Sequence, residues 1–415
     1  MTTQLKNQKR QFWVILIVIF IGFIGISMPY LIFPPLFLNL EYSFLPSSWG
    51  DSSRALFLGI TLAVYPLGQF IGSPILGTLS DDYGRKHLLS GSLVISSICN
   101  LLTGIAIAKQ HLSLLIISRF VAGFMEGNIA IARAMCADLK MLSKHKTFGK
   151  INAASSIAYL LGPLLGGVMT DKQLFAASTT STPFYFICIL FLVLSALSAL
   201  TLKHSVATPA VKKRTLWQRF NFVARSSTLF SNKTLKNLMI TSTGFTLAVD
   251  IFYEFGPVYL TAKWMFTPTQ LILYNGVLCI GLAVGNGWLP TLISSRVSNL
   301  VSIVSAIGGF AFLLFGIVFS NSNFLMLTWF ALSGLAIGLA VTLLTVKISD
   351  SVSDNIQGEV MGTQLSLRVL GDGIICLFGG ALLILSPKII LIMAAITSLA
   401  TMLYFKSKYH ILTHQ

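Results

Sequence analysis

The sequence predicts an all-α integral membrane protein in which twelve transmembrane helices form two six-helix pseudo-repeats. Of its 415 residues, 54% are hydrophobic and only 10% are charged, whereas soluble proteins carry about 25% charged residues. Long apolar segments recur along the chain, each close to the length of roughly 20 residues that a helix needs to cross a bilayer. These segments are 12–37, 54–79, 87–108, 112–137, 148–169, 183–202, 237–260, 269–293, 298–320, 324–347, 360–386 and 388–405.

The longest polar break runs from Lys203 to Lys236 and divides the apolar segments six and six. It contains eight basic residues and no acidic residue. We therefore expect an N-terminal six-helix bundle over 1–202, a basic cytoplasmic linker over 203–236, and a C-terminal six-helix bundle over 237–415. The linker is either an amphipathic segment on the membrane surface or a disordered connection.

Glycines repeat between the two halves at a constant spacing of 213 residues. Gly68 and Gly72 correspond in this way to Gly281 and Gly285, and Gly149 corresponds to Gly362. A shared offset within corresponding helices indicates a duplication of a six-helix unit.

The formal net charge of +16 follows the pattern expected of a membrane protein. With the N-terminus in the cytoplasm, twelve helices return the C-terminus there, and the cytoplasmic segments hold 21 Lys and Arg against five outside. This asymmetry is the positive-inside rule, so the charge indicates orientation and attraction to anionic lipid, not a nucleic-acid partner. We expect a multi-pass protein of a bacterial inner membrane, with both termini cytoplasmic, that functions as a monomer.

The reactive residue types form no recognisable catalytic or metal-binding pattern in the sequence. The five cysteines fall within predicted helices and form no CxxC pair, so we expect neither disulfides nor a metal site. No Ser/His/Asp grouping, HExxH motif or phosphate-binding loop occurs. We therefore expect no enzyme and no cofactor, apart from a coupling proton.

A polar motif, GTLSDDYGRK from Gly77 to Lys86, separates the second and third apolar segments. The small Gly77 is expected to let neighbouring helices approach closely. Gly84 can adopt backbone angles that a bulkier residue cannot. Asp81, with Arg85 and Lys86, is expected to form a charged latch in a short loop.

This motif resembles the loop between helices 2 and 3 of the major facilitator superfamily, which reads G-x-x-x-D-[RK]-x-G-[RK]-[RK]. Asp82 stands where the family usually has a basic residue. The stretch Arg119-Phe-Val-Ala-Gly123 looks like the R-x-x-x-G element of the same superfamily. The segment Gln357-Gly-Glu-Val-Met-Gly362 looks like the entry to helix 11 of tetracycline and multidrug exporters.

The fifth apolar segment is similar to the G-x-x-x-G-P-x-x-G-G signature of proton-coupled drug antiporters. Its residues are Ala158, Gly162, Pro163, Gly166 and Gly167, with alanine in place of the first glycine. A proline without a backbone donor, flanked by glycines that allow close helix packing, suits a hinge.

The resemblance implies a secondary transporter that works by alternating access, with its substrate site between the halves near the bilayer midplane. It favours proton-coupled export of a small organic molecule. The alternative is a proton-coupled transporter of an anionic metabolite or a carboxylate siderophore. The resemblance also implies that Asp138 is a partner of Arg85, in a contact that closes the cytoplasmic side.

Seven charged residues lie in the interior of the predicted helices, away from the helix ends. A charge at the bilayer centre costs at least about 2.5–3.5 kcal/mol on insertion scales, so we expect each of these residues to serve proton coupling, substrate binding or pairing. They are Arg119, Glu126, Arg133, Asp250, Glu254, Arg368 and Asp372.

Arg119, Glu126 and Arg133 are spaced seven and seven residues apart in the fourth segment. On a continuous helix they drift only about 20° per step and span about 21 Å. One face therefore carries all three charges, which either line a substrate path or pair with other helices. For Arg119, the family resemblance favours coupling or proton handling.

Asp250 and Glu254 are one helical turn apart, so their side chains are neighbours. Two carboxylates in a low-dielectric site resist ionising together, so one of them is expected to load and release the coupling proton. Alternatively, one acid permanently neutralises an arginine. Arg368 and Asp372 have the same spacing but opposite signs and most simply neutralise each other, unless Arg368 holds a substrate carboxylate.

Three tyrosines are candidates for lining a cavity. They are Tyr30, Tyr159 and Tyr253.

Overall fold

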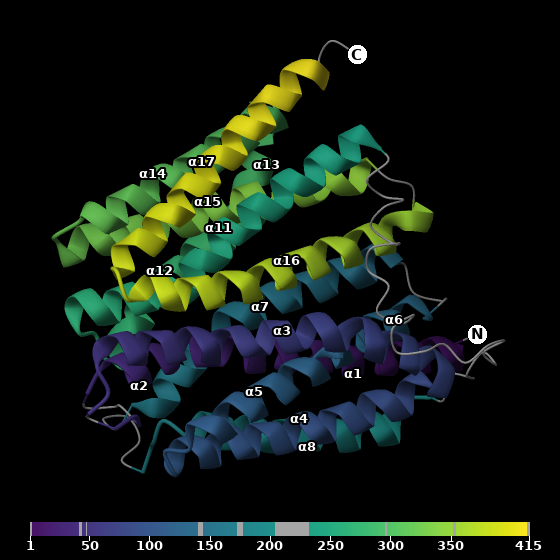
Figure 1. Cartoon of the computed structure of the whole chain (residues 1–415). Helices are drawn as coiled ribbons and strands as arrows, with labels where there is room; N and C mark the ends of the chain where they lie inside the picture. The colour runs from purple at the N-terminus through teal and green to yellow at the C-terminus, as the bar shows by residue number, and fades with distance from the viewer. Residues whose placement is uncertain are drawn as a thin grey trace. The chain divides into compact units, whose positions relative to one another are not determined.

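The computed structural model describes residues 2–40, 44–46, 48–139, 144–171, 177–203, 232–294, 297–351 and 354–412. These described residues are almost entirely helical and contain no β-strand (Figure 1). The chain divides into two compact units. The first unit comprises Met1–Gly50 and Ile60–Asn221, and the second comprises Asp51–Gly59 and Phe222–Gln415.

The helices of the first unit follow the predicted segments, with additional breaks. Pro29, Pro34 and Pro35 interrupt the first predicted helix, because proline lacks a backbone donor and clashes with the preceding turn. A 3₁₀ turn and a short helix follow there instead. The elements are α1 (Thr2–Ser27), η1 (Met28–Leu31), α2 (Phe33–Leu38), α3 (Asp51–Tyr83), α4 (Arg85–Ala108), α5 (Leu112–Met125), α6 (Gly127–Ala137), α7 (Lys144–Thr170) and α8 (Thr182–Thr201). The start of α3, Asp51–Gly59, belongs to the second unit.

The second unit begins with a well-capped helix. The Asn232 side chain accepts hydrogen bonds from the backbone N–H groups of Thr234 and Leu235 at 3.0 and 3.2 Å, which satisfies two orphan donors of the first turn. The helix predicted over 269–293 is broken at Trp288. The elements are α11 (Lys233–Trp264), α12 (Pro268–Gly287), α13 (Leu289–Ser294), α14 (Asn299–Phe319), α15 (Asn323–Asp350), α16 (Asp354–Leu383) and α17 (Pro387–Leu412).

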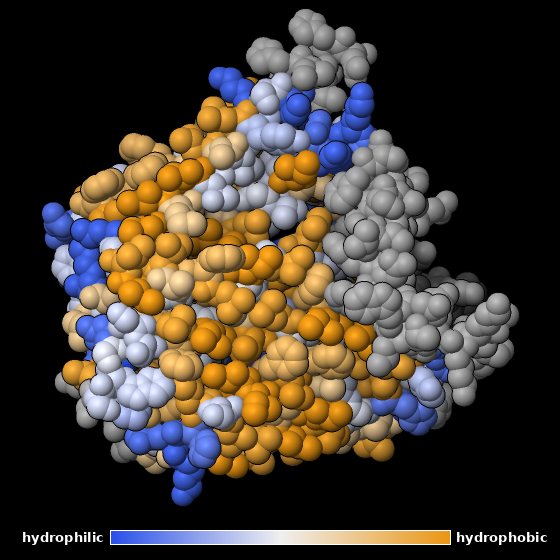
Figure 2. All heavy atoms as spheres, viewed as in Figure 1, coloured by the Kyte–Doolittle hydropathy of each residue, from blue (hydrophilic) through white to orange (hydrophobic). Residues whose placement is uncertain are grey.

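Ten helices within the described residues are long and apolar enough to cross a membrane. The two other predicted spans fall on α11 and on α7, whose apolar part, Ile157–Thr170, is shorter. Large hydrophobic side chains are exposed on the outer faces, as on α8 with Ile189 at 60% and Leu200 at 85%. Figure 2 shows hydrophobic residues over much of the visible face. Such exposure suits lipid contact, so the prediction of an integral multi-pass membrane protein is confirmed.

Glycines allow helix backbones to touch within each unit. A Cβ atom added to Gly68 would lie 2.9 Å from the backbone nitrogen of Phe124, so α3 and α5 cross in near-contact. In the second unit, a Cβ atom added to Gly338 would lie 2.7 Å from the backbone nitrogen of Asn286, so α12 and α15 cross likewise. Small residues at helix interfaces permit this approach in membranes.

The predicted latch loop between the second and third spans is reduced to a single residue. α3 ends at Tyr83, α4 begins at Arg85, and Gly84 between them has a φ of 93°. The prediction that Gly84 needs unusual backbone angles is thus confirmed. The prediction for Gly77 is wrong, because a Cβ atom there would meet nothing within 4 Å.

The basic linker predicted over 203–236 lies mostly outside the described residues. Residues 204–231 are not described, and α11 already begins at Lys233.

Candidate functional site

In the first unit, a buried cation and a buried acid both contact one tyrosine. Arg119 and Glu126 are only 3% and 2% exposed, and Tyr65 is 7% exposed. The Tyr65 hydroxyl donates a hydrogen bond of 2.6 Å to Oε2 of Glu126. The Arg119 guanidinium carbon lies 4.3 Å from the centre of the Tyr65 ring, within cation–π range. Tyr65 therefore contacts both charged groups.

A break in the fourth predicted span places Glu126. α5 ends at Met125 and α6 begins at Gly127, so Glu126 sits in the turn between them. Its N–H donates to the carbonyl of Gly123, and its carbonyl accepts from the N–H of Ile129, each at 3.0 Å. These three-residue steps are tighter than an α-helix. The expectation of one continuous helix through the three charges is therefore wrong.

Arg133 lies beyond this break, on α6. Its Nε is buried and has no hydrogen-bond partner among the described residues.

A small cavity opens beside Arg119. Its volume of about 10 Å³ is near what a single water requires. Tyr30, Thr61 and Tyr65 contribute to its lining. Tyr159 is not part of that lining, but its hydroxyl donates to the Tyr30 hydroxyl at 3.2 Å.

The second unit contains a strong ion pair between α11 and α16. Nε of Arg368 lies 2.9 Å from Oδ2 of Asp250, and Nη2 lies 2.6 Å from Oδ1. This bidentate geometry uses both carboxylate oxygens. The expected neutralisation of Arg368 by Asp372 is therefore wrong, because the guanidinium reaches across to the neighbouring helix. Asp250 is only 2% exposed, so its charge is strongly dependent on this partner.

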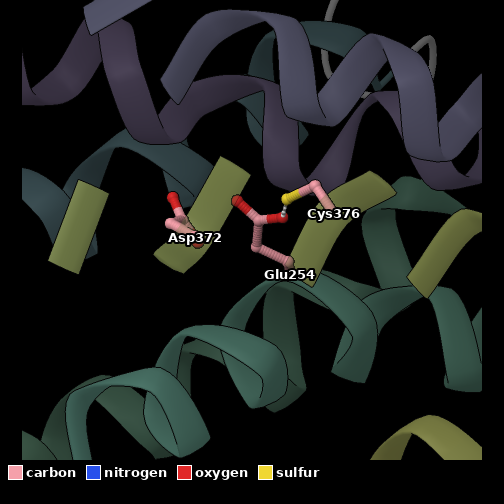
Figure 3. Close-up of side chains that lie close together, drawn as sticks. All are labelled: Glu254, Asp372 and Cys376. Atoms are coloured by element: carbon pink, nitrogen blue, oxygen red, sulfur yellow. Dashed lines mark hydrogen bonds between the residues drawn. The ribbon is translucent and has the colours of Figure 1, made fainter. Parts of the chain in front are cut away.

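Glu254, Asp372 and Cys376 form a second group beside this pair (Figure 3). The Cys376 thiol donates a hydrogen bond to Oε2 of Glu254. Oδ1 of Asp372 is buried and has no hydrogen-bond partner among the described residues. One donor atom from each of the three side chains lies within 4.8 Å of the others.

Such a group can hold a metal ion, but its hydrogen bonding favours a different interpretation. A metal binds the thiolate form of cysteine, whereas Cys376 here keeps its hydrogen and donates it to Glu254. The group therefore brings two carboxylates and a hydrogen-bonding thiol together. The absence of a metal site stays a prediction.

The third candidate tyrosine, Tyr253, lies on α11 between the two acids. Its ring centre is 6.2 Å from that of Phe252. The lining of the described cavity does not include it.

The predicted contact between Arg85 and Asp138 is present. Nη1 of Arg85 donates to Oδ2 of Asp138 and, at 2.9 Å, to the carbonyl of Ala134. The guanidinium thus joins the first turn of α4 to the end of α6. Lys86 is partly buried beside it, and the side chain of Asp81 lies outside the described residues.

The glycines of the predicted hinge bring α7 against the first span. A Cβ atom on Gly162 would lie 2.7 Å from the carbonyl oxygen of Ile24, and one on Gly166 would lie 2.8 Å from that of Met28. Pro163 lies inside the continuous α7, and Gly167 is buried. The predicted close approach of neighbouring helices is confirmed here.

Two residues of these sites were not predicted from the sequence. Cys376 lies four residues after Asp372, so the i, i+4 rule already placed both on one helix face. Tyr65 lies three residues before Gly68, on the side of α3 that meets α5. In both cases the helical spacing contained the signal, but a tyrosine or a cysteine in a membrane helix is usually a packing residue.

Membrane-length helices and two buried groups of charged side chains define a multi-pass integral membrane protein. Residues 15–375 match the family model described as Major Facilitator Superfamily, and the chain belongs to this superfamily.

Two curated relatives are bacterial resistance proteins. The chain is 32% identical over 184 residues to "Tetracycline resistance protein, class H" of Pasteurella multocida, a match that covers 44% of this chain and 41% of that protein. It is 28% identical over 209 residues to "Multidrug resistance protein 2" of Bacillus subtilis (strain 168), which covers 50% of this chain and 47% of that protein. The matched segments therefore span less than half the length of either relative.

Solved structures share the fold along almost the whole chain. The human organic anion transporter MFSD10 (TETRAN) matches with a TM-score of 0.68 at 16% identity, over 96% of this chain and 99% of that chain. The POT family transporter PepTSo matches with a TM-score of 0.72 at 12% identity, over 98% and 99%. At such low identities the likeness concerns the fold alone.

Proposed function

We propose that this chain is a secondary active transporter with twelve transmembrane helices, which exports a small organic molecule in exchange for protons by alternating access. The carrying observation is the buried group of Asp250, Glu254 and Asp372, three acids accompanied by the guanidinium of Arg368. Unneutralised charge is costly inside a membrane. Protonation of two of these three acids is the simplest way to keep the group neutral.

Hydrogen bonding within this group supports a proton-binding role. Asp250 is held by two guanidinium nitrogens, a bidentate arrangement that makes it the fixed partner of Arg368. Oδ1 of Asp372 has no partner among the described residues, and a protonated acid there leaves less charge to be stabilised. Glu254 and Asp372 are thus the acids that we assign to the coupling proton, with Asp250 and Arg368 as the fixed pair.

The family and its resistance proteins support export as the direction of transport. The relatives are named for resistance to tetracycline and to multiple drugs. The glycine crossing of α3 and α5 recurs in that of α12 and α15, which supports a duplicated six-helix unit. In this proposal both termini are cytoplasmic, the contact of Arg85 with Asp138 closes that side, and α7 bends at Pro163.

A second candidate is transport of an organic anion such as a metabolite or a carboxylate siderophore. One observation favours it: the buried Arg119 lies over the rings of Tyr65 and Phe33 and forms no ion pair within the described part of the chain. The direction of proton movement separates the two candidates. An exporter brings protons into the cytoplasm as substrate leaves, whereas a symporter brings protons in together with substrate.

Reconstitution tests the proposal. The full chain is placed in liposomes that contain a pH-sensitive dye and is offered lipophilic cations, antibiotics and carboxylates. We expect substrate-dependent proton flux, and we expect its loss in the double variant Glu254→Gln, Asp372→Asn while substrate exchange continues. Asp51→Asn, an exposed acid at the start of α3, is the matched control. Undiminished proton coupling in the double variant would contradict the proposed site.

A further inference from the structure

We propose that the cavity beside Arg119 is a subsite for the carboxylate group of an organic anion with an apolar, aromatic body. This inference rests on the proposed function, because it names the substrate class of the proposed transporter. Its physical basis lies within the first unit alone.

The guanidinium of Arg119 is a buried cation that forms no ion pair among the described residues. Its carbon lies 4.3 Å from the Tyr65 ring centre and 5.8 Å from that of Phe33. Its Nε has no hydrogen-bond partner among the described residues. Aromatic faces offset part of the cost of burying a cation, but they leave N–H donors unused. Buried donors without partners are costly, so an anion that accepts from them is favoured.

The nearby acid does not occupy this position. Glu126 is held by the Tyr65 hydroxyl at 2.6 Å, and no ion pair between Glu126 and Arg119 exists in the described structure. Tyr65 thus contacts the acid through its hydroxyl and the cation through its ring face. A second carboxylate can therefore approach Arg119 without displacing Glu126.

The cavity walls select the rest of the ligand. Phe33, Tyr30 and Tyr65 present aromatic surface, and Pro29 and Leu62 add apolar surface. A volume of about 10 Å³ has room for one oxygen-sized atom, so one carboxylate oxygen would enter the cavity and the rest of the ligand would lie at its rim. The shape and chemistry suit a carboxylate that enters first, followed by a flat apolar ring against the aromatic rim.

Equilibrium binding of benzoate, with benzamide as its uncharged isostere, tests this subsite in the purified full chain in detergent. A charge-assisted hydrogen bond to a buried group contributes enough to separate the two probes by about tenfold or more. We expect wild-type protein to prefer benzoate to at least that extent. Equal affinities for the two probes, or no benzoate binding, would overturn the inference.

Two substitutions test whether Arg119 causes the preference for benzoate over benzamide. Arg119→Gln is expected to bind both probes equally, and Arg119→Lys, which keeps the charge on a side chain without the planar fork, is expected to fall between it and wild type. Lys150→Gln is the control, because Lys150 also lies over aromatic rings, at 6.0 and 5.8 Å from those of Phe12 and Trp13, but is exposed.

A wild-type benzoate preference in Arg119→Gln, or wild-type benzoate affinity in Arg119→Lys, would overturn the assignment. The lysine variant keeps the test decisive if the glutamine variant does not fold. Binding and flux also separate the two proposals. Benzoate binding without any proton flux in liposomes contradicts the transport mechanism, whereas flux without benzoate binding contradicts only the subsite.

Discussion

The hydroxyl of Tyr65, on α3, donates a hydrogen bond of 2.6 Å to Glu126, which lies in the turn between α5 and α6. The ring of the same tyrosine lies under the guanidinium of Arg119. One uncharged side chain therefore contacts two oppositely charged groups that do not form an ion pair with each other. Its hydroxyl and its ring make separable contributions, which substitution can resolve.

Tyr65→Phe removes the hydroxyl and keeps the ring. We expect a loss of about 1–3 kcal/mol of stability, because Glu126 keeps a buried oxygen without its donor. Thermal unfolding of the purified protein measures this loss. Tyr274→Phe is the control, since Tyr274 is similarly buried and its recorded contacts are made by its ring. Equal shifts in the two variants would show that the bond to Glu126 contributes nothing specific.

The ion pair between Asp250 and Arg368 predicts an unequal response to its two single variants. Arg368→Gln leaves a carboxylate that is 2% exposed without its cation, at a cost of about 3–5 kcal/mol. Asp250→Asn leaves an arginine that is 34% exposed and can be hydrated, so we expect a cost of about 1–3 kcal/mol.

Chemical unfolding of both single variants and of the double variant measures these costs. The double variant is expected to be less destabilised than the sum of the two single variants, because neither charge is then left alone. Strict additivity would mean that the observed pair is not energetically coupled.

Glycine-to-alanine substitutions at Gly162 and Gly77 should have opposite effects. At Gly162 the new methyl group would lie 2.7 Å from the carbonyl oxygen of Ile24, and overpacking of this kind costs about 1–3 kcal/mol. At Gly77 it meets nothing within 4 Å, so helix propensity alone should stabilise α3 by about 0.5–1 kcal/mol. Melting temperatures compare the two, and a stabilised Gly162→Ala would contradict the close packing of α7 on α1.

Arg85→Ala should affect transport more than stability. The Arg85 and Asp138 side chains are 21% and 51% exposed, and exposed ion pairs contribute only about 0–1 kcal/mol. If the contact closes one face of the transporter, its loss slows the turnover and leaves substrate affinity unchanged. Rates in liposomes for Arg85→Ala, Asp138→Ala and the double variant test this. The double variant should be no slower than either single variant, and additive slowing would refute a shared role.

Much of the fold was predictable, because lipid imposes a simple rule on each span. A backbone in hydrocarbon must satisfy its own hydrogen bonds, so the apolar segments had to become helices. The breaks at Glu126 and Trp288 were not predictable in this way. Pro290 follows the second break by two residues and is a signal that the sequence analysis did not use, whereas no proline accompanies the turn at Glu126.

The pairing of charges was predictable only where the family resemblance implied it. Spacing placed Arg368 and Asp372 on one face, yet the guanidinium binds Asp250 on another helix, 118 residues away. Sequence spacing cannot rank a neighbour on the same helix against one across a helix interface, because that choice depends on how the two helices are rotated. Arg85 and Asp138 were matched through the family motif and not through spacing.

The separations along the chain also determine the order in which these partners are made. Tyr65 precedes Glu126 by 61 residues, so the hydroxyl is already synthesised when the charges of α5 and α6 leave the ribosome. Arg368 follows Asp250 by 118 residues, an interval of roughly 6 to 24 seconds at ordinary translation rates. The acids of α11 must therefore enter the bilayer, or remain at its surface, before Arg368 has been synthesised. Assembly of the second unit thus depends on a late step, in which α16 is synthesised and its Arg368 pairs with Asp250 on the earlier α11.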